Sequence, residues 1–99
     1  MNFEIVSYLD QKNISHSVLG FAYLASAINL AIKNPELKYH TTELYRAIAS
    51  THKTTPTSVE RCIRHAIEKS GCAKIVNREF ISIAVDSISP NFDWNEDKQ

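Results

Sequence analysis

Residues 54–68 read TTPTSVERCIRHAIE, and this stretch combines a strong helix start with a helix that has two faces. Thr55 suits an N-cap, and Pro56 suits the first helical position, where the N–H group that proline lacks would have no partner. On a helical wheel, the apolar side chains that follow fall on one side: Val59, Cys62, Ile63, Ala66 and Ile67. We therefore predict an amphipathic helix over about 56–70, ended by Gly71.

A shorter helix is predicted directly upstream, from about Thr42 to Ser50 or Thr51. Leu44, Ala47 and Ile48 lie on one face of it, and Thr41 or Thr42 can cap it. Residues 52–56 between the two helices include no large apolar side chain, which predicts a tight polar turn. Two helices joined in this way form a helix-turn-helix, here over about 42–70.

Apolar residues at helical spacing predict three more helices, over about 2–12, 18–34 and 77–88. The second of these is the best candidate for a central buried helix. The chain has 99 residues, enough for one domain, and its two Gly and three Pro are too few for a many-stranded sandwich. We expect an all-α fold, a compact five- to six-helix domain over 1–90, followed by a flexible acidic tail over 91–99.

The charged residues are unevenly distributed along the chain. Lys and Arg number 11, as do Asp and Glu, so the formal net charge is zero. However, residues 1–37 carry −1, residues 38–78 carry +5 and residues 79–99 carry −4. The basic part coincides with the predicted helix-turn-helix, so the neutral total does not exclude double-stranded DNA as a partner.

The outer face of the second helix carries groups that can read base pairs in a major groove. Arginine can donate two parallel hydrogen bonds to guanine, and a glutamate can accept one from cytosine, which makes Arg61, Arg64 and Glu60 the candidate base-reading residues. Thr54, Thr55 and Ser58 lie at the helix N-terminus, where phosphate binds readily, and Lys53 of the turn joins them.

No other chemistry has a comparable pattern. Cys62 and His65 have a Cys-x-x-His spacing but fall on different faces of the helix, and no second ligand pair is found. No nucleophile has a base at a motif-like spacing, and no Gly-rich loop could hold a nucleotide. We expect no enzyme activity, cofactor, metal or small-molecule substrate. The N-terminus does not resemble a signal peptide, and no apolar run could span a membrane, which predicts a cytoplasmic protein with no membrane partner.

The same segment closely resembles the recognition-helix region of the stage-zero sporulation protein A family, in its DNA-binding effector domain. The match rests on Val-Glu-Arg followed by Ile-Arg-His-Ala-Ile-Glu within 54–68. Three further matches extend it over about 13–88: GFAYLASAI at 20–28, Leu44-Tyr45 with Ile48-Ala49, and the Asn77 to Asp86 segment. The resemblance implies an all-helical transcription factor domain that binds a short DNA box. It leaves open whether the chain acts as a homodimer or as a tandem pair on adjacent boxes.

By this resemblance, Glu60, Arg61 and Arg64 fall on base-reading positions, and Thr54, Thr55, Ser58 and His65 fall at or beside phosphate-contacting ones. Three departures accompany it. Ser58 stands where familiar members have Arg, and the 71–76 segment is shorter than the family's loop. A receiver domain of about 100 to 150 residues does not fit before Asn13. If Met1 is the natural start, the aspartate switch is absent, and DNA binding is constitutive or set by concentration or a partner.

One alternative remains open. The chain could be a non-enzymatic interaction module that keeps the effector fold and pairs with full-length family members as an antagonist.

Overall fold

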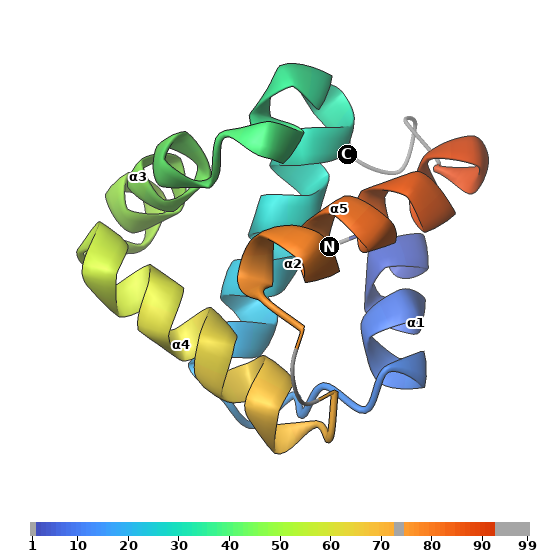
Figure 1. Ribbon diagram of the computed structural model, residues 1–99, viewed down its shortest axis with the longest axis horizontal. Helices are drawn as coiled ribbons and strands as arrows, with labels where there is room; N and C mark the ends of the chain where they lie inside the picture. Colours follow the sequence, from blue (N-terminus) through green and yellow to red (C-terminus); the bar gives the residue numbers. More distant parts are fainter. Residues whose placement is uncertain (1, 73–74, 93–99) are drawn as a thin grey trace.

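Helix α2 (Leu19–Lys33) runs through the middle of the molecule, and the other elements pack around it (Figure 1). The computed structural model describes residues 2–72 and 75–92. Within these ranges the chain forms five α-helices and two short 3₁₀ helices: α1 (Phe3–Gln11), α2, η1 (Pro35–Tyr39), α3 (Thr41–His52), α4 (Pro56–Lys69), α5 (Asn77–Ile88) and η2 (Ser89–Asn91). The all-α prediction is confirmed, and the predicted helices lie within two residues of their expected bounds.

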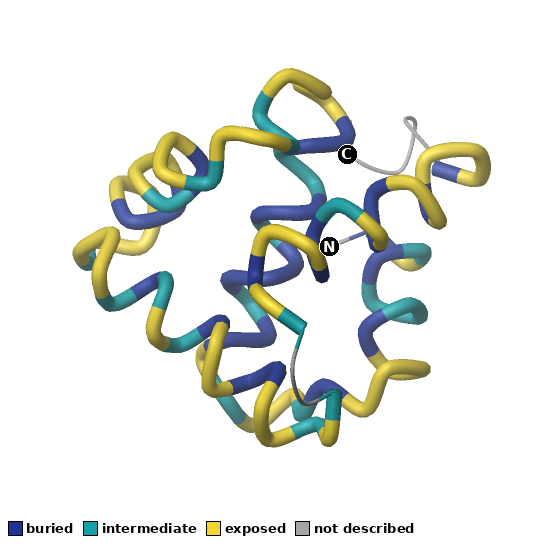
Figure 2. The backbone as a smooth tube through the Cα atoms, in the orientation of Figure 1, coloured by how far each residue is buried: buried dark blue, intermediate teal, exposed yellow. Residues whose placement is uncertain are grey.

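Helix α2 is buried because its side chains are apolar on nearly every side. Leu24, Ala27, Ile28 and Ala31 have no exposed surface. In Figure 2 the helix is therefore mostly in the buried colour, whereas the surrounding helices alternate between buried and exposed turns. The predicted central helix is confirmed. It ends at Asn34 because Pro35 restricts the residue before it.

Gly20 lets α2 and α4 approach each other closely. A Cβ atom added to Gly20 would lie 2.3 Å from the carbonyl oxygen of Cys62 and 2.6 Å from the Cβ of Ala66, both in α4. Any larger side chain would push the two helices apart. The position of α4 therefore depends on a glycine near the start of α2.

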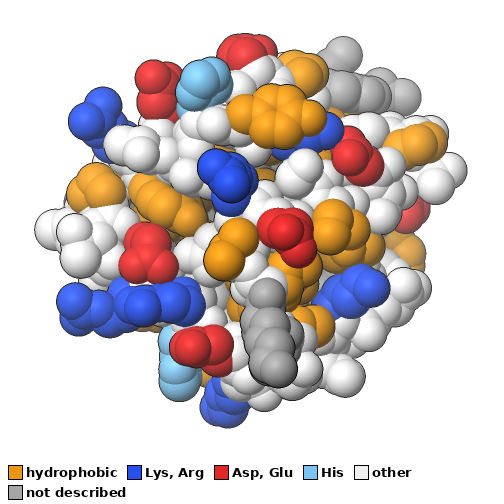
Figure 3. All heavy atoms as spheres, viewed as in Figure 1, with side chains coloured by type: hydrophobic (Ala, Val, Ile, Leu, Met, Phe, Trp, Pro, Cys, Tyr) orange, Lys and Arg blue, Asp and Glu red, His pale blue; other side chains and the backbone are white. Residues whose placement is uncertain are grey.

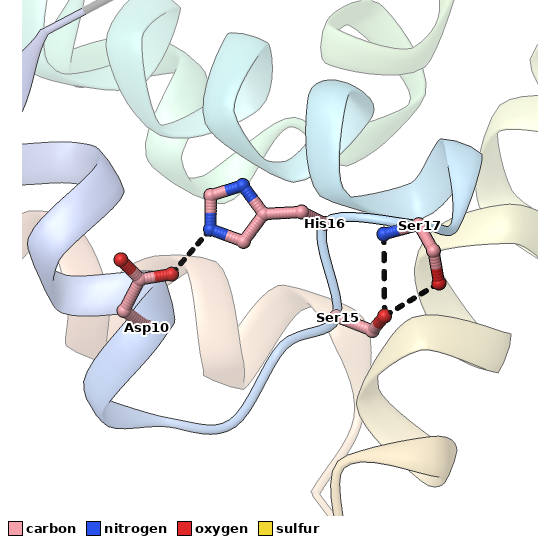
Figure 4. Close-up of polar contacts among 4 residues, drawn as sticks. All are labelled: Asp10, Ser15, His16 and Ser17. Carbon is pink, nitrogen blue, oxygen red and sulfur yellow. Dashed lines mark hydrogen bonds and ion pairs between the residues drawn. The ribbon is translucent and has the colours of Figure 1, made fainter.

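The connection between α1 and α2 is held by local polar contacts (Figure 4). Asn13 ends α1 in the left-handed region, with φ 62°. A ring nitrogen of His16 bonds the carboxylate of Asp10, and the ring stacks on Phe21 with centroids 4.0 Å apart. The Ser15 hydroxyl oxygen accepts the N–H of Ser17. These contacts give His16 a structural role in the connection.

The start of α3 differs from the prediction. Neither Thr41 nor Thr42 caps this helix, since Thr41 is its first residue and His40 stands at the N-cap without a side-chain bond. The cause is η1, which the sequence pattern did not predict. This short helix ends at Tyr39, so His40 alone separates it from α3, and its Lys38 donates to the carboxylate of Asp86 in α5 at 2.6 Å.

The predicted faces of α5 are confirmed, since Phe80, Ile81, Ala84, Val85 and Ile88 are all buried. The chain then continues through η2, and Phe92 is 7% exposed and belongs to the core cluster. Core packing thus extends two residues beyond position 90. The acidic tail was predicted over 91–99, and its residues 93–99 lie outside the described part of the chain.

Candidate nucleic-acid interface

The turn between α3 and α4 is closed by backbone hydrogen bonds. Lys53 adopts the left-handed conformation, with φ 55° and ψ 48°, and the N–H of Thr54 donates to the carbonyl of Ala49 at 2.9 Å. The next helix starts as predicted, because the Thr55 hydroxyl accepts the N–H of Ser58 at 3.1 Å and Pro56 occupies the first position. Gly71 stops it with φ 91°. The tight polar turn is thus built from local bonds.

Helix α4 has the two faces that the wheel predicts. Val59, Ile63, Ala66 and Ile67 are at most 2% exposed, and Cys62 is half-buried. The opposite face carries Arg61, Arg64 and His65, all of which are exposed. In Figure 3, basic and acidic side chains lie side by side over this helix at the lower left of the view. The apolar face seats α4 on the core and leaves its charged face toward solvent.

Glu60 lies less freely than the wheel suggests. Its side chain is 39% exposed, and its Oε2 atom lies 3.3 Å from Nε of Arg64, one turn further along the helix. An exposed pair of this kind contributes only about 0.3–0.5 kcal/mol to stability. Its main effect is therefore geometric, because it ties the orientation of one arginine to that of a carboxylate.

Asn77, the first residue of α5, joins three helices at this point. Its Nδ2 lies 3.1 Å from the main-chain oxygen of Glu60, 3.3 Å from Oε2 of Glu60 and 3.2 Å from the hydroxyl of Tyr45 in α3. Burial raises the pKa of the Tyr45 hydroxyl above its ordinary value of 10.0. The hydroxyl therefore stays protonated and neutral at physiological pH.

Two hollows border the exposed face of α4. One of about 520 Å³ lies between α3, α4 and the start of α5, and its lining includes Glu60, Arg64 and Arg78. The other, of about 260 Å³, lies toward the start of α2 and is lined partly by Arg61 and His65. The two candidate arginines are therefore both exposed but border different hollows.

The remaining candidates cluster at the start of α4. Lys53 and Thr55 are exposed, whereas Thr54 and Ser58 are half-buried. In the first turn of α4, Pro56 has no N–H and the N–H of Ser58 already donates to the Thr55 hydroxyl, which leaves the N–H of Thr57 and the positive end of the helix dipole for a bound anion.

Sequence reasoning placed Glu60 among the base-reading residues but missed its partners, Asn77 and Tyr45. The sequence gives only a weak indication of this contact. Asn77 is a polar residue at the start of a helix with a regular apolar face, but it is not the N-cap of that helix, because Val76 holds that position. Only the folded chain shows that the side chain of Asn77 turns toward α4.

The described residues form no disulfide, metal site or membrane span. Cys62 and Cys72 are free thiols. Over residues 2–72 and 75–92, no three His, Cys, Asp or Glu side chains are grouped as a metal ion would need. No helix in the same ranges is long and apolar enough to cross a membrane.

A short helix, a tight turn and an amphipathic second helix with arginines on its outer face define a helix-turn-helix domain of the all-α class. Residues 5–84 of this domain match the family model described as sporulation initiation factor Spo0A C terminal. The match covers most of the chain, so the chain belongs to this family, as the sequence resemblance predicted. The family is a DNA-binding, transcription-regulating one and not an enzyme family.

Proposed function

We propose that this chain is a non-enzymatic transcriptional regulator that binds a specific double-stranded DNA box with α4 in the major groove. The observation that carries the proposal is the exposed arginine pair, Arg61 and Arg64, on a helix whose other face is fully buried. A helix seated in this way can enter a groove without unfolding any of its core contacts. Its site of action would be the cytoplasm, where the DNA would lie.

In this proposal the base-reading residues are Arg61, Arg64 and Glu60. Each arginine can form the two-bond fork with guanine O6 and N7. Glu60 uses Oε2 for Arg64 and Asn77. Its other carboxylate oxygen, for which the described residues supply no partner, would accept from a cytosine amino group. Glu60 would thus read a base and orient an arginine at the same time.

Most phosphate contacts would come from the turn before α4 and the start of that helix, and they are assigned to Lys53, Thr54, Thr55 and Ser58. One more is assigned to His65, further along the same helix. The positive end of the helix dipole points the same way, which favours a phosphate there. With Ser58 in place of the Arg of familiar members, this set holds one positive charge fewer, and we expect a smaller salt dependence of binding for that reason.

The first experiment measures the affinity for a duplex that this chain enriches from a random library, by fluorescence anisotropy at two salt concentrations. Arg61→Ala and Arg64→Ala should each weaken binding by about 1–3 kcal/mol. Lys69→Ala is the matched control, since it removes one positive charge from the last turn of the same helix. Its effect should be smaller and alike on all duplexes.

Two outcomes would contradict the proposal. Parental affinity in both arginine variants would show that the base-reading assignment is wrong. No binding to any duplex at low salt would instead favour an antagonist that pairs with full-length family members. Whether the domain binds as a homodimer or as a tandem pair follows from the stoichiometry on one box and on two adjacent boxes.

A further inference from the structure

Asn77 lies outside the proposed DNA contacts but bonds directly to one of them. We infer that Asn77 is a positioning residue for base reading: its side-chain amide holds Glu60, and Glu60 in turn orients the guanidinium of Arg64. The inference rests on the proposed function, because it assigns a role in how α4 reads a base pair. It concerns a residue of α5, which itself would touch no DNA.

The amide of Asn77 has a defined orientation. Two of its contacts are the main-chain oxygen and Oε2 of Glu60, at 3.1 and 3.3 Å, and both of these can only accept a hydrogen bond. The nitrogen of the amide must therefore face α4. Asn77 is 9% exposed, so little water competes for these bonds. The hydroxyl oxygen of Tyr45 in α3 lies 3.2 Å from the same nitrogen, so the two amide hydrogens are shared among three acceptors.

The orientation is passed on to Arg64 through one atom. Oε2 of Glu60 accepts a hydrogen bond from the amide of Asn77 at 3.3 Å and forms an ion pair with Nε of Arg64, also at 3.3 Å. Because the carboxylate lies beside Nε, the two terminal nitrogens of the guanidinium remain available for the fork that guanine requires. An arginine held in this way loses less conformational freedom on binding than a free one.

Arg61 provides an internal comparison. It borders the hollow near Leu19 and His65 and is not among the residues that line the hollow at Asn77. A change at Asn77 should therefore affect the base pair that Arg64 reads and not the one that Arg61 reads. Loss of folded protein, in contrast, would weaken binding to every duplex by the same factor.

The test measures discrimination instead of bare affinity. The full chain is titrated with the enriched duplex and with duplexes substituted at each base pair, and the affinity ratio is taken at each position. The base pair read by Arg64 is the one at which Arg64→Ala brings the affinity ratio to about one. The base pair read by Arg61 is identified in the same way with Arg61→Ala. Asn77→Ala should lower the ratio at the Arg64 position by about three- to tenfold and leave the Arg61 position unchanged.

A second variant guards against poor folding of Asn77→Ala. Asn77→Asp keeps the shape of the side chain and adds an acid at a helix start, where acids are favourable. At pH 8 its carboxylate cannot donate to Glu60 and repels it, so the same ratio should fall. Circular dichroism confirms folding of each variant. In the Arg64→Ala background, neither Asn77 change should alter the ratio at the Arg64 position further, because the route from Asn77 to that base pair is already removed.

The outcomes distinguish a failure of the proposed function from a failure of the positioning role of Asn77. If Arg64→Ala changes no ratio, the proposed function fails and the role of Asn77 fails with it. If Arg64→Ala acts as expected but folded Asn77 variants keep the parental ratios, only the positioning role is overturned. Equal loss at all positions would mark Asn77 as purely structural and would overturn it as well.

Discussion

Lys53 occupies a backbone conformation that is unusual for its residue type. At φ 55° and ψ 48° it lies in the left-handed region, where a side chain costs roughly 1–2 kcal/mol and where glycine is the ordinary choice. Asn13 has a similar φ of 62°, but asparagine tolerates this region better. A lysine in the turn before α4 is explained if its charge contributes to the proposed DNA binding.

This reasoning predicts opposite effects of one substitution on stability and on binding. Lys53→Gly should raise the free energy of unfolding by about 1 kcal/mol, measured by urea denaturation, because it relieves the left-handed strain. It should also lower the salt dependence of DNA binding by about one unit in the log–log slope. Lys53→Ala is the control that removes the charge and keeps the strain. A stabilising effect of Lys53→Ala equal to that of Lys53→Gly would refute the backbone explanation.

Single residues with local partners could be predicted from the sequence, and residues with distant partners could not. Thr55, Pro56 and Gly71 act within their own turn, so the two ends of α4 followed from their types. Glu60 was expected on the free face because a wheel represents one helix only. Its partner Asn77 lies 17 residues further along the chain and meets it only after α5 has packed.

The same limit holds for whole elements. The bounds of α2 and α5 follow from their long apolar periods. The start of α3 does not, because η1 runs up to Tyr39 and leaves only His40 as the N-cap of that helix. The five residues of η1 are too few to show a repeating apolar pattern, so this helix could not be recognised from the sequence. The helices with strong patterns were therefore predicted well, and the short connector was not.

The contact between α2 and α4 predicts a large effect of a small side chain. Gly20→Ala should destabilise the domain by about 1–3 kcal/mol, since its Cβ would meet a backbone carbonyl that cannot move aside without shifting α4. Thermal and urea denaturation would measure the loss. Gly71→Ala is the comparison, because there a Cβ meets nothing within 4 Å and only the φ of 91° opposes it.

Removal of one of the two steric contacts should not restore the stability of Gly20→Ala. Adding Ala66→Gly removes the Cβ at 2.6 Å, but the Cys62 carbonyl at 2.3 Å remains. Full recovery of stability in the double variant, or parental stability of Gly20→Ala alone, would show that the two helices are not in the described contact.

At the scale of the whole molecule, the distribution of charge bears on the proposed binding to DNA. The +5 of residues 38–78 is offset by the acidic segments on either side, so long-range attraction to a polyanion is weak. In the proposed function, most of the affinity would then come from the short-range contacts of α4. This is the arrangement expected of a domain that relies on specific binding.

Removal of acidic charge near the C-terminus should therefore weaken selectivity. A variant with Asp93→Asn, Glu96→Gln and Asp97→Asn should bind a random duplex several-fold more tightly at 50 mM salt, measured by anisotropy. The gain should shrink strongly at 200 mM, because salt screens exposed charges over about 10 Å or less. An equal gain at both salt concentrations would show that it does not arise from long-range charge.

The central place of α2 also has a consequence for hydrogen exchange in heavy water. Ala27 and Ile28 have no exposed surface, and α2 packs against all four other α-helices, so we expect their amide hydrogens to exchange mainly when the entire domain opens. Their exchange rates would report the free energy of global opening under native conditions, without denaturant. The Lys53 and Gly20 variants could then be ranked on one scale by two amide signals.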